Sequence, residues 1–143
     1  MFKTLIGSDY AIELLTKLNQ SKKNIDIIMY DWRFYPDNPE HPISEINQAI
    51  FRAVNRGVIV RCVVNNREIA NNLKPYKVQA KYLKSSRILH SKIVIIDNEL
   101  LFIGSHNLTR NAVTTNLESS LMLEIPKEET RIFEYFKNLF ESN

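Results

Sequence analysis

Two short stretches of the chain carry side chains that could attack a phosphorus centre and hold its oxygens. The first contains His90 and Lys92, which point to one face if they lie on a β-strand. The second contains Ser105 and Asn107, which also share one parity and would return past that face through a hairpin. The imidazole could attack, while an ammonium, an amide and a hydroxyl would stabilise the anionic transition state. The pattern predicts nucleophilic chemistry on a bound anion such as a phosphoryl group.

Two carboxylates could assist this chemistry. Glu118 opens the last predicted strand and could accept a hydrogen bond from the second ring nitrogen of His90, which would fix the tautomer. Asp97 follows Lys92 by five residues, so strict alternation sends it to the opposite face. For Asp97 we keep two interpretations, a catalytic role and a turn-stabilising side chain that accepts hydrogen bonds from nearby backbone N–H groups.

The spacing of these residues is similar to that of a known family. The chain resembles the phospholipase D superfamily at the six positions of its HxKx4Dx6GSxN motif, which are His90, Lys92, Asp97, Gly104, Ser105 and Asn107. Glu118 falls where that family often has its histidine-orienting acid. The joined motif is far less probable by chance than any of its parts. The similarity extends from about Asn24 to Phe140, because Arg56-Gly57-Val58 before an apolar strand also resembles the family.

This resemblance implies a two-step, metal-independent reaction without a cofactor. One histidine attacks the phosphodiester to give a covalent phosphohistidine, and a second histidine protonates the leaving oxygen and later activates water. Each site needs two motifs, whereas this chain carries one, like the short bacterial endonucleases of the family. The resemblance therefore implies a homodimer in which His90 of each protomer faces one phosphate, with Lys92 and Asn107 flanking it.

The remaining histidines and the cysteine are interpreted as structural. His106 differs in parity from its neighbours Ser105 and Asn107, and His41 lies in a proline-rich loop where exposure is expected. Cys62 lies in an apolar run and has no second cysteine to pair with, so we expect a small buried hydrophobe. No set of potential ligands has paired spacing, so we predict no metal site.

Positive charge is concentrated in the segment before His90. Between residues 66 and 87 only Glu68 opposes six cationic side chains, which are Arg67, Lys74, Lys77, Lys81, Lys84 and Arg87. We predict that the last three of these bind substrate phosphates, with a solvated charged face as the alternative. Trp32 and Arg33 follow a predicted strand at the edge where α/β sheets bind ligands. They are candidates for base stacking and phosphate contact, with core or lid packing as the alternative.

Alternating helices and strands would position these residues. Helical periodicity predicts helices over about 9–18, with Ile12, Leu15 and Leu18 in its apolar stripe, over 44–56 and over 128–140. Apolar runs predict strands over 25–30, 58–64, 89–96, 100–104 and 118–125, and residues 31–42 form a long loop. The run at 58–64 indicates a strand covered on both faces and reached by a right-handed crossover. We predict one α/β domain over 1–143, with a mixed, largely parallel β-sheet sandwiched by helices.

Composition favours a nucleic acid, DNA or RNA, as the substrate. The net charge of +3 and the pI near 9.0 favour an anionic partner. No segment approaches the roughly 18 apolar residues of a membrane span, and the first apolar stretch is too short for an export signal. We therefore expect a cytoplasmic protein without stable membrane insertion. A phospholipid-cleaving phosphodiesterase and a non-catalytic nucleic-acid-binding or assembly module remain alternatives, and a helicase or restriction-type partner is left open.

Overall fold

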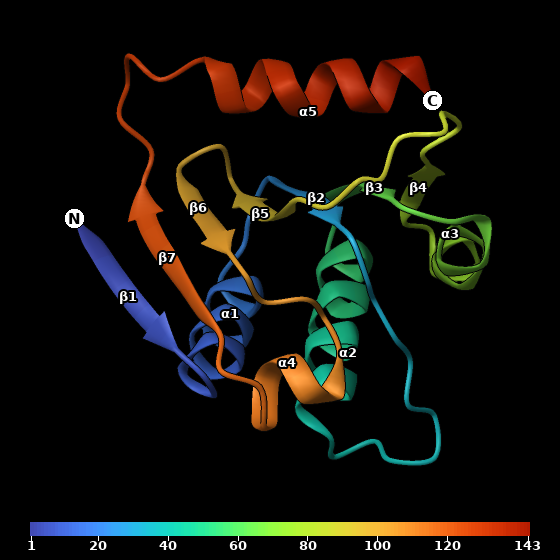
Figure 1. Cartoon of the computed structure of the whole chain (residues 1–143), viewed down its shortest axis with the longest axis vertical. Helices are drawn as coiled ribbons and strands as arrows, with labels where there is room; N and C mark the ends of the chain where they lie inside the picture. Colours follow the sequence, from blue (N-terminus) through green and yellow to red (C-terminus); the bar gives the residue numbers. More distant parts are fainter.

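The computed structural model describes residues 1–143 and contains one seven-stranded sheet with helices on both faces (Figure 1). The strands are β1 (Phe2–Ile6), β2 (Asn24–Met29), β3 (Ile59–Val64), β4 (Gln79–Tyr82), β5 (Lys92–Ile96), β6 (Leu100–Gly104) and β7 (Ser119–Glu124). The helices are α1 (Asp9–Asn19), α2 (Pro42–Asn55), α3 (Arg67–Leu73), the short 3-10 helix η1 (Lys74–Tyr76), α4 (Arg110–Thr114) and α5 (Arg131–Ser142). None of them has both the length and the apolar character that crossing a membrane requires.

The sheet changes from antiparallel to parallel pairing at β2. Its strand order is β1-β7-β6-β5-β2-β3-β4. The pairs β2–β3 and β3–β4 are parallel, whereas β1–β7, β7–β6, β6–β5 and β5–β2 are antiparallel. The prediction of a mixed sheet between helices is confirmed. Its description as largely parallel is wrong, because four of the six strand pairs are antiparallel and only β2–β3 and β3–β4 are parallel.

Helices cover the two faces of the sheet unequally. Helices α1 and α2 pack on one face and enclose the larger core, whereas α5 lies alone across the other face (Figure 1). The smaller core beneath α5 joins Phe136 to apolar side chains of β2, β3, β5 and β6, such as Ile28 and Ile93. Strands β2 and β3 are buried from both sides, which explains why their sequences are nearly continuous apolar runs.

The predicted apolar stripe of α1 is partly wrong. The helix buries Tyr10, Ala11, Leu14 and Leu18, while the side chain of Ile12 is 67% exposed. Tyr10 and Ala11 lie on the same face as Leu14 and Leu18 at i+3 and i+4 spacing, so a polar-tipped tyrosine replaces the isoleucine in the core.

Helix α2 begins at Pro42, two residues before the predicted start. His41 is its N-cap, because Nδ1 of the ring accepts a hydrogen bond of 3.0 Å from the backbone N–H of Ile43. The expectation that His41 is exposed is wrong, since capping and packing against Tyr35 bury it. At the other end Gly57 has a φ of +100°, which ends the helix as predicted.

The hairpin of β5 and β6 has the predicted strands and a tight turn. Asp97 and Asn98 both have positive φ, as a type I′ turn requires. Strand β5 begins at Lys92, so His90 lies in the irregular segment just before the strand. The N-terminal strand β1 is not among the predicted elements. It pairs with β7 at the edge of the sheet, over a hundred residues away in sequence.

Candidate active site

His90 and Lys92 form a close pair at the end of the sheet. The Nζ atom of Lys92 lies 2.9 Å from Nδ1 and 3.3 Å from Nε2 of His90. Tyr30, which follows β2, packs beside both side chains. Its ring centroid lies 4.9 Å from that of His90 and 5.3 Å from the ammonium nitrogen of Lys92. The prediction that the imidazole and the ammonium lie on one face is in agreement with these distances. The imidazole itself is exposed to solvent.

The residues on either side of His90 hold it in place. The backbone N–H of Leu89 donates a hydrogen bond of 3.2 Å to Oδ1 of Asn65, and the Leu89 side chain is buried in the core beneath α5. The hydroxyls of Ser91 and Tyr135 are 2.8 Å apart, which joins the segment to α5. The segment around His90 is irregular but anchored on both sides, and it presents an exposed imidazole. A nucleophile held in one orientation loses less conformational entropy on reaching the transition state.

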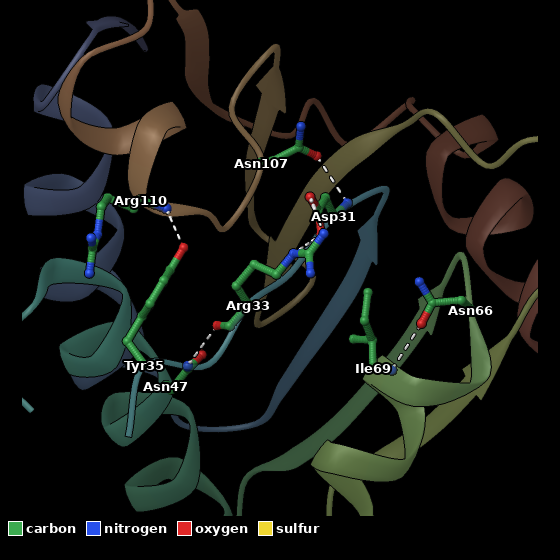
Figure 2. Close-up of polar contacts among 8 residues, drawn as sticks. All are labelled: Asp31, Arg33, Tyr35, Asn47, Asn66, Ile69, Asn107 and Arg110. Atoms are coloured by element: carbon green, nitrogen blue, oxygen red, sulfur yellow. Dashed lines mark hydrogen bonds and ion pairs between the residues drawn. The ribbon is translucent and has the colours of Figure 1, made fainter. Parts of the chain in front are cut away.

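Asn107 is oriented by the loop that follows β2. Its Oδ1 accepts a hydrogen bond of 3.1 Å from the backbone N–H of Asp31 (Figure 2). Because the side-chain oxygen is used in this way, the amide NH₂ group remains as the donor for a ligand. The backbone fixes this arrangement, since the N–H of Leu108 donates to the carbonyl of Asp31 and the N–H of Arg33 donates to the carbonyl of Leu108.

Glu118 does not contact His90 within the chain. Its Oε2 accepts a hydrogen bond of 3.1 Å from Nδ2 of Asn116. Partial burial lowers the pKa of Lys92, and the attraction of Glu118 partly offsets that effect. The predicted hydrogen bond from Glu118 to the imidazole of the same chain is therefore wrong, because the start of β7 places the carboxylate toward the ammonium side of the pair.

Ser105 joins the end of β6 to the start of β7. Its hydroxyl donates a hydrogen bond of 3.2 Å to the carbonyl of Ser119 and accepts one of 3.0 Å from the N–H of the same residue. The prediction that this hydroxyl helps to hold a ligand is wrong for this conformation, because its proton is already used between the two strands.

Asp97 lies at the far end of β5 from His90, in the hairpin turn. Its carboxylate accepts hydrogen bonds from the backbone N–H groups of Lys22, at 3.1 Å, Lys23, at 2.7 Å, and Asn24, at 3.2 Å. The catalytic interpretation of Asp97 is not supported by this position. Of the two interpretations, the structural one agrees with these contacts, although the N–H groups belong to the segment before β2 rather than to the hairpin itself.

We expect Asp97→Ala to lower stability without removing activity. The substitution leaves three backbone N–H groups without their charged acceptor, and should lower the free energy of unfolding by about 2 kcal/mol. Urea unfolding followed by the fluorescence of Trp32, the only tryptophan, measures this loss. Glu99→Ala is the matched control, since it removes an exposed carboxylate from the same turn. A variant with full stability and no activity would restore the catalytic interpretation.

Two lysines of the positive segment before His90 form hydrogen bonds within the fold. The ammonium of Lys81 donates a hydrogen bond of 2.7 Å to the carbonyl of Phe140 and lies over its ring. That of Lys84 donates one of 2.6 Å to the carbonyl of Asn143. Both cations therefore stabilise the C-terminal end of α5, where the helix dipole is negative, and their assignment as substrate ligands stays a prediction. Arg87 remains exposed, so its assignment stays a prediction.

Trp32 and Arg33 have different environments. The indole of Trp32 is buried, and its N–H donates a hydrogen bond of 2.7 Å to Oδ1 of Asn47, so the base-stacking prediction is wrong and the core-packing alternative is correct. Arg33 is exposed, forms an ion pair of 2.8 Å with Asp31 and lines an open pocket that also borders Asn107. Its assignment as a phosphate ligand stays a prediction.

His106 and Cys62 are structural, as predicted. His106 is fully buried, with Nδ1 2.7 Å from the hydroxyl of Ser120 and Nε2 2.8 Å from the carbonyl of Gly7, and it stacks on Tyr10. Burial lowers the pKa of His106. Burial also raises the pKa of the Cys62 thiol to about 12, so the thiol is unreactive at neutral pH.

Sequence reasoning missed several residues that shape the site. Asn65 and Tyr135 hold the segment around His90, and Arg110 lines the pocket beside Asn107. Asn65 follows β3 as Tyr30 follows β2, at the carboxyl edge of two parallel strands, and that edge rule could have identified it. No local signal identifies Tyr135 or Arg110, because both reach the site through tertiary packing.

Comparisons with known proteins identify the family and the fold of the chain. The family model described as "Cardiolipin synthase, PLD-like domain" matches residues 14–142. Mitochondrial cardiolipin hydrolases from Chlamydomonas reinhardtii and Canis lupus familiaris are each 29% identical over 104 residues, which cover 68% of this chain. The matches cover 47% and 41% of those relatives, so the chain spans less than half of their length.

Two solved structures have the same fold. Nuc from Salmonella typhimurium, a phospholipase D family member, superimposes with a TM-score of 0.80 and 21% identity over 99% of this chain and 95% of that one. NucT from Helicobacter pylori gives a TM-score of 0.75 and 22% identity over 99% and 98%. The family model covers almost the whole chain, and the predicted resemblance is confirmed. The chain belongs to the phospholipase D superfamily through a PLD-like domain.

Proposed function

We propose that this chain is a metal-independent phosphodiesterase that cleaves nucleic acid through a covalent phosphohistidine at a site shared by two protomers. Its superfamily supports the general phosphodiesterase reaction. The observation that carries the proposal is the pair of exposed His90 and Lys92, 2.9 Å apart, at the sheet edge where the amide of Asn107 also lies. These are the nucleophile and the donors that a phosphoryl group requires.

Substrate binding would activate the imidazole. An ammonium can only donate hydrogen bonds, so the lone pair of His90 faces Lys92 in the free protein. A bound phosphate would compete for the ammonium protons through its nonbridging oxygens and release the lone pair. The anion would also favour the charged form of Lys92, whose pKa is lowered by burial. Lys92 therefore both holds the substrate and controls when the nucleophile is free.

The reaction then proceeds in two displacements at phosphorus. In the first, a ring nitrogen of His90 forms a bond to phosphorus as the bond to the leaving oxygen breaks, and the imidazolium of His90 of the partner subunit donates its proton to that oxygen. In the second, His90 of the partner subunit takes a proton from water, whose oxygen bonds to phosphorus as the phosphorus–nitrogen bond breaks. Lys92 and Asn107 bind the nonbridging oxygens in both steps.

A second copy of the chain would complete this site. One chain supplies one exposed imidazole, whereas the mechanism uses two. The sheet face beside α5 is uncovered over β1, β6 and β7, where Phe2, Ile6, Ile103 and Leu121 are exposed. This apolar area reaches the end of the sheet that carries the site, since Ile6 pairs with Ser119. We propose that a two-fold dimer buries this area.

A phospholipid is the second candidate substrate. The matched family description and the names of both curated relatives refer to cardiolipin, a phospholipid. A phosphodiester in a lipid presents the same two nonbridging oxygens as one in DNA or RNA, so His90 and Lys92 act identically on both. The pocket beside Asn107 supports nucleic acid as the first candidate, because seven of its eight lining residues are polar and two of them are arginines that can bind further phosphates of a strand.

A substrate panel tests the proposed function. The wild-type protein should cleave labelled single-stranded or double-stranded DNA or RNA in excess chelator, and quenching with a denaturant at alkaline pH, where the phosphorus–nitrogen bond is stable, should trap a phosphorylated histidine. Its rate should fall steeply with added salt, because binding the polyanion releases counterions. Cardiolipin vesicles form the second arm. Cleavage confined to vesicles would replace the nucleic-acid substrate with a lipid, and activity that chelation abolishes would contradict the metal-independent mechanism.

A further inference from the structure

Asn107 is one of the residues that line an open polar pocket, whose lining does not include His90. The pocket is formed by side chains from the loop after β2, from the segment after β6 and from α4 and its flanking residues. Of these lining residues, Figure 2 shows Asp31, Arg33, Tyr35, Asn107 and Arg110, and Asp31 lies between Arg33 and Asn107. The lining residues of the pocket are Asp31, Arg33, Tyr35, Asn107, Thr109, Arg110, Asn111 and Asn116. Tyr35 contributes the only aromatic ring, and most of the other side chains can donate hydrogen bonds.

Arg110 is the uncompensated charge of this pocket. Asp31 is neutralised by its ion pair with Arg33, and no carboxylate lies within 4.0 Å of the Arg110 guanidinium. The guanidinium is nevertheless braced by packing, because its carbon lies 5.1 Å from the centroid of the Tyr35 ring. Burial and the charge of Arg110 lower the pKa of His41, so that ring stays neutral at pH 7.

This arrangement is suited to an anion. A braced guanidinium loses little conformational entropy when it binds phosphate, and its planar donors match two phosphate oxygens. Asn107 lines the pocket and accepts a hydrogen bond from the N–H of Asp31, the residue after Tyr30, whose ring packs against His90 with centroids 4.9 Å apart. The loop after β2 therefore connects the pocket to the His90–Lys92 pair.

We propose that the pocket binds a second phosphate of the same nucleic-acid strand, with Arg110 as its principal ligand. This inference rests on the proposed nuclease function and specifies how the strand is held. The phosphate next to the scissile one would contact Arg110, and the hydroxyl of Thr109 or the amide of Asn111 would complete its hydrogen bonds. A substrate with a single phosphodiester would not use the pocket.

The test compares substrates that have one and several phosphates. We expect Arg110→Gln to lower the ratio of kcat/KM for a single-stranded oligonucleotide to that for bis(p-nitrophenyl) phosphate by about tenfold. Arg110→Lys should restore part of the ratio, since it keeps the charge but loses the planar donors. Arg131→Gln, which removes an exposed arginine from α5, should leave the ratio unchanged. A second substrate replaces the phosphate next to the scissile one with a neutral methylphosphonate. This replacement should lower kcat/KM of the wild type by a similar factor. It should lower kcat/KM of Arg110→Gln very little, because that variant has already lost the contact.

Three results would overturn the inference. An Arg110→Gln variant that cleaves the oligonucleotide as the wild type does would refute the second phosphate site and leave the nuclease function intact. Equal losses on both substrates would show that Arg110 supports the reaction centre or the fold. A wild-type protein that hydrolyses the small diester but no oligonucleotide would refute the nuclease function and, with it, the subsite.

Discussion

Replacing His90 with alanine should lower the rate of phosphodiester cleavage by at least about a thousandfold, because the nucleophile of a covalent mechanism has no substitute. The affinity for substrate should change little, since Lys92 and Asn107 remain. Stability should also be unchanged, because the imidazole is exposed and packs only against Tyr30 and Lys92. Single-turnover cleavage in excess chelator measures the rate, and fluorescence anisotropy of a labelled oligonucleotide measures the affinity.

Two controls make this result specific to the proposed mechanism. Added imidazole should return part of the activity to His90→Ala, as expected when only the ring is missing. In mixed dimers, refolded with the variant in large excess, nearly every wild-type chain pairs with a variant chain, and its activity should disappear. Wild-type chains that keep full activity in such mixtures would show that one chain contains a complete site. Retained activity in His90→Ala alone would rule out the nucleophile.

The second large effect, a loss of stability, is expected when Gly104 is replaced. This position of the motif has no room for a side chain. Gly104 lies opposite Ser120 in the β6–β7 pair, and a Cβ atom at this position would collide with the hydroxyl and Cα of Ser120 and with the carbonyl of Ser119. The Ser120 hydroxyl cannot simply move away, because it contacts the buried ring of His106. We expect Gly104→Ala to lower the free energy of unfolding by about 3 kcal/mol or more.

Gly57→Ala separates the steric cost of an added Cβ atom from the cost of a positive φ angle. Gly57 has a φ of +100°, and nothing lies within 4 Å of the Cβ position. This substitution should therefore cost only backbone strain, about 1 to 2 kcal/mol. Urea unfolding of both variants, followed by Trp32 fluorescence, gives the comparison. Equal losses would mean that β6 and β7 separate easily, and that the glycine of the motif has no steric role.

The parts of the fold that the sequence predicts well are those with strong local signals. The apolar runs of β2 and β3, and the β5–β6 hairpin with its polar turn, are each recognisable from one short continuous segment. Strand β1 has no such signal, because Phe2–Ile6 is short and its partner lies at residues 119–124. The sequence overestimates the parallel share of the sheet for the same reason, since strand order depends on distant pairing.

The site is predictable where alternation along a strand decides the geometry, and not where tertiary packing does. His90 and Lys92 are two residues apart, and their contact agrees with the alternation expected of extended backbone, although β5 itself begins only at Lys92. Lys81 and Lys84 form part of a charged run, but only the position of α5 shows that their ammonium groups are used at its end. The position of Glu118 after the motif predicts a hydrogen bond to His90. In the structure its carboxylate instead accepts a hydrogen bond from the side-chain amide of Asn116.

The pairing of β1 with β7 has a consequence for synthesis on the ribosome. Translation produces residues 2–6 well before residues 119–124, so β1 has no partner while most of the chain emerges. During that time Phe2 and Ile6 and one full edge of backbone hydrogen-bonding groups remain open to other nascent chains. Slow elongation before β7 would therefore favour aggregation, because β1 gains its only partner strand when residues 119–124 are available.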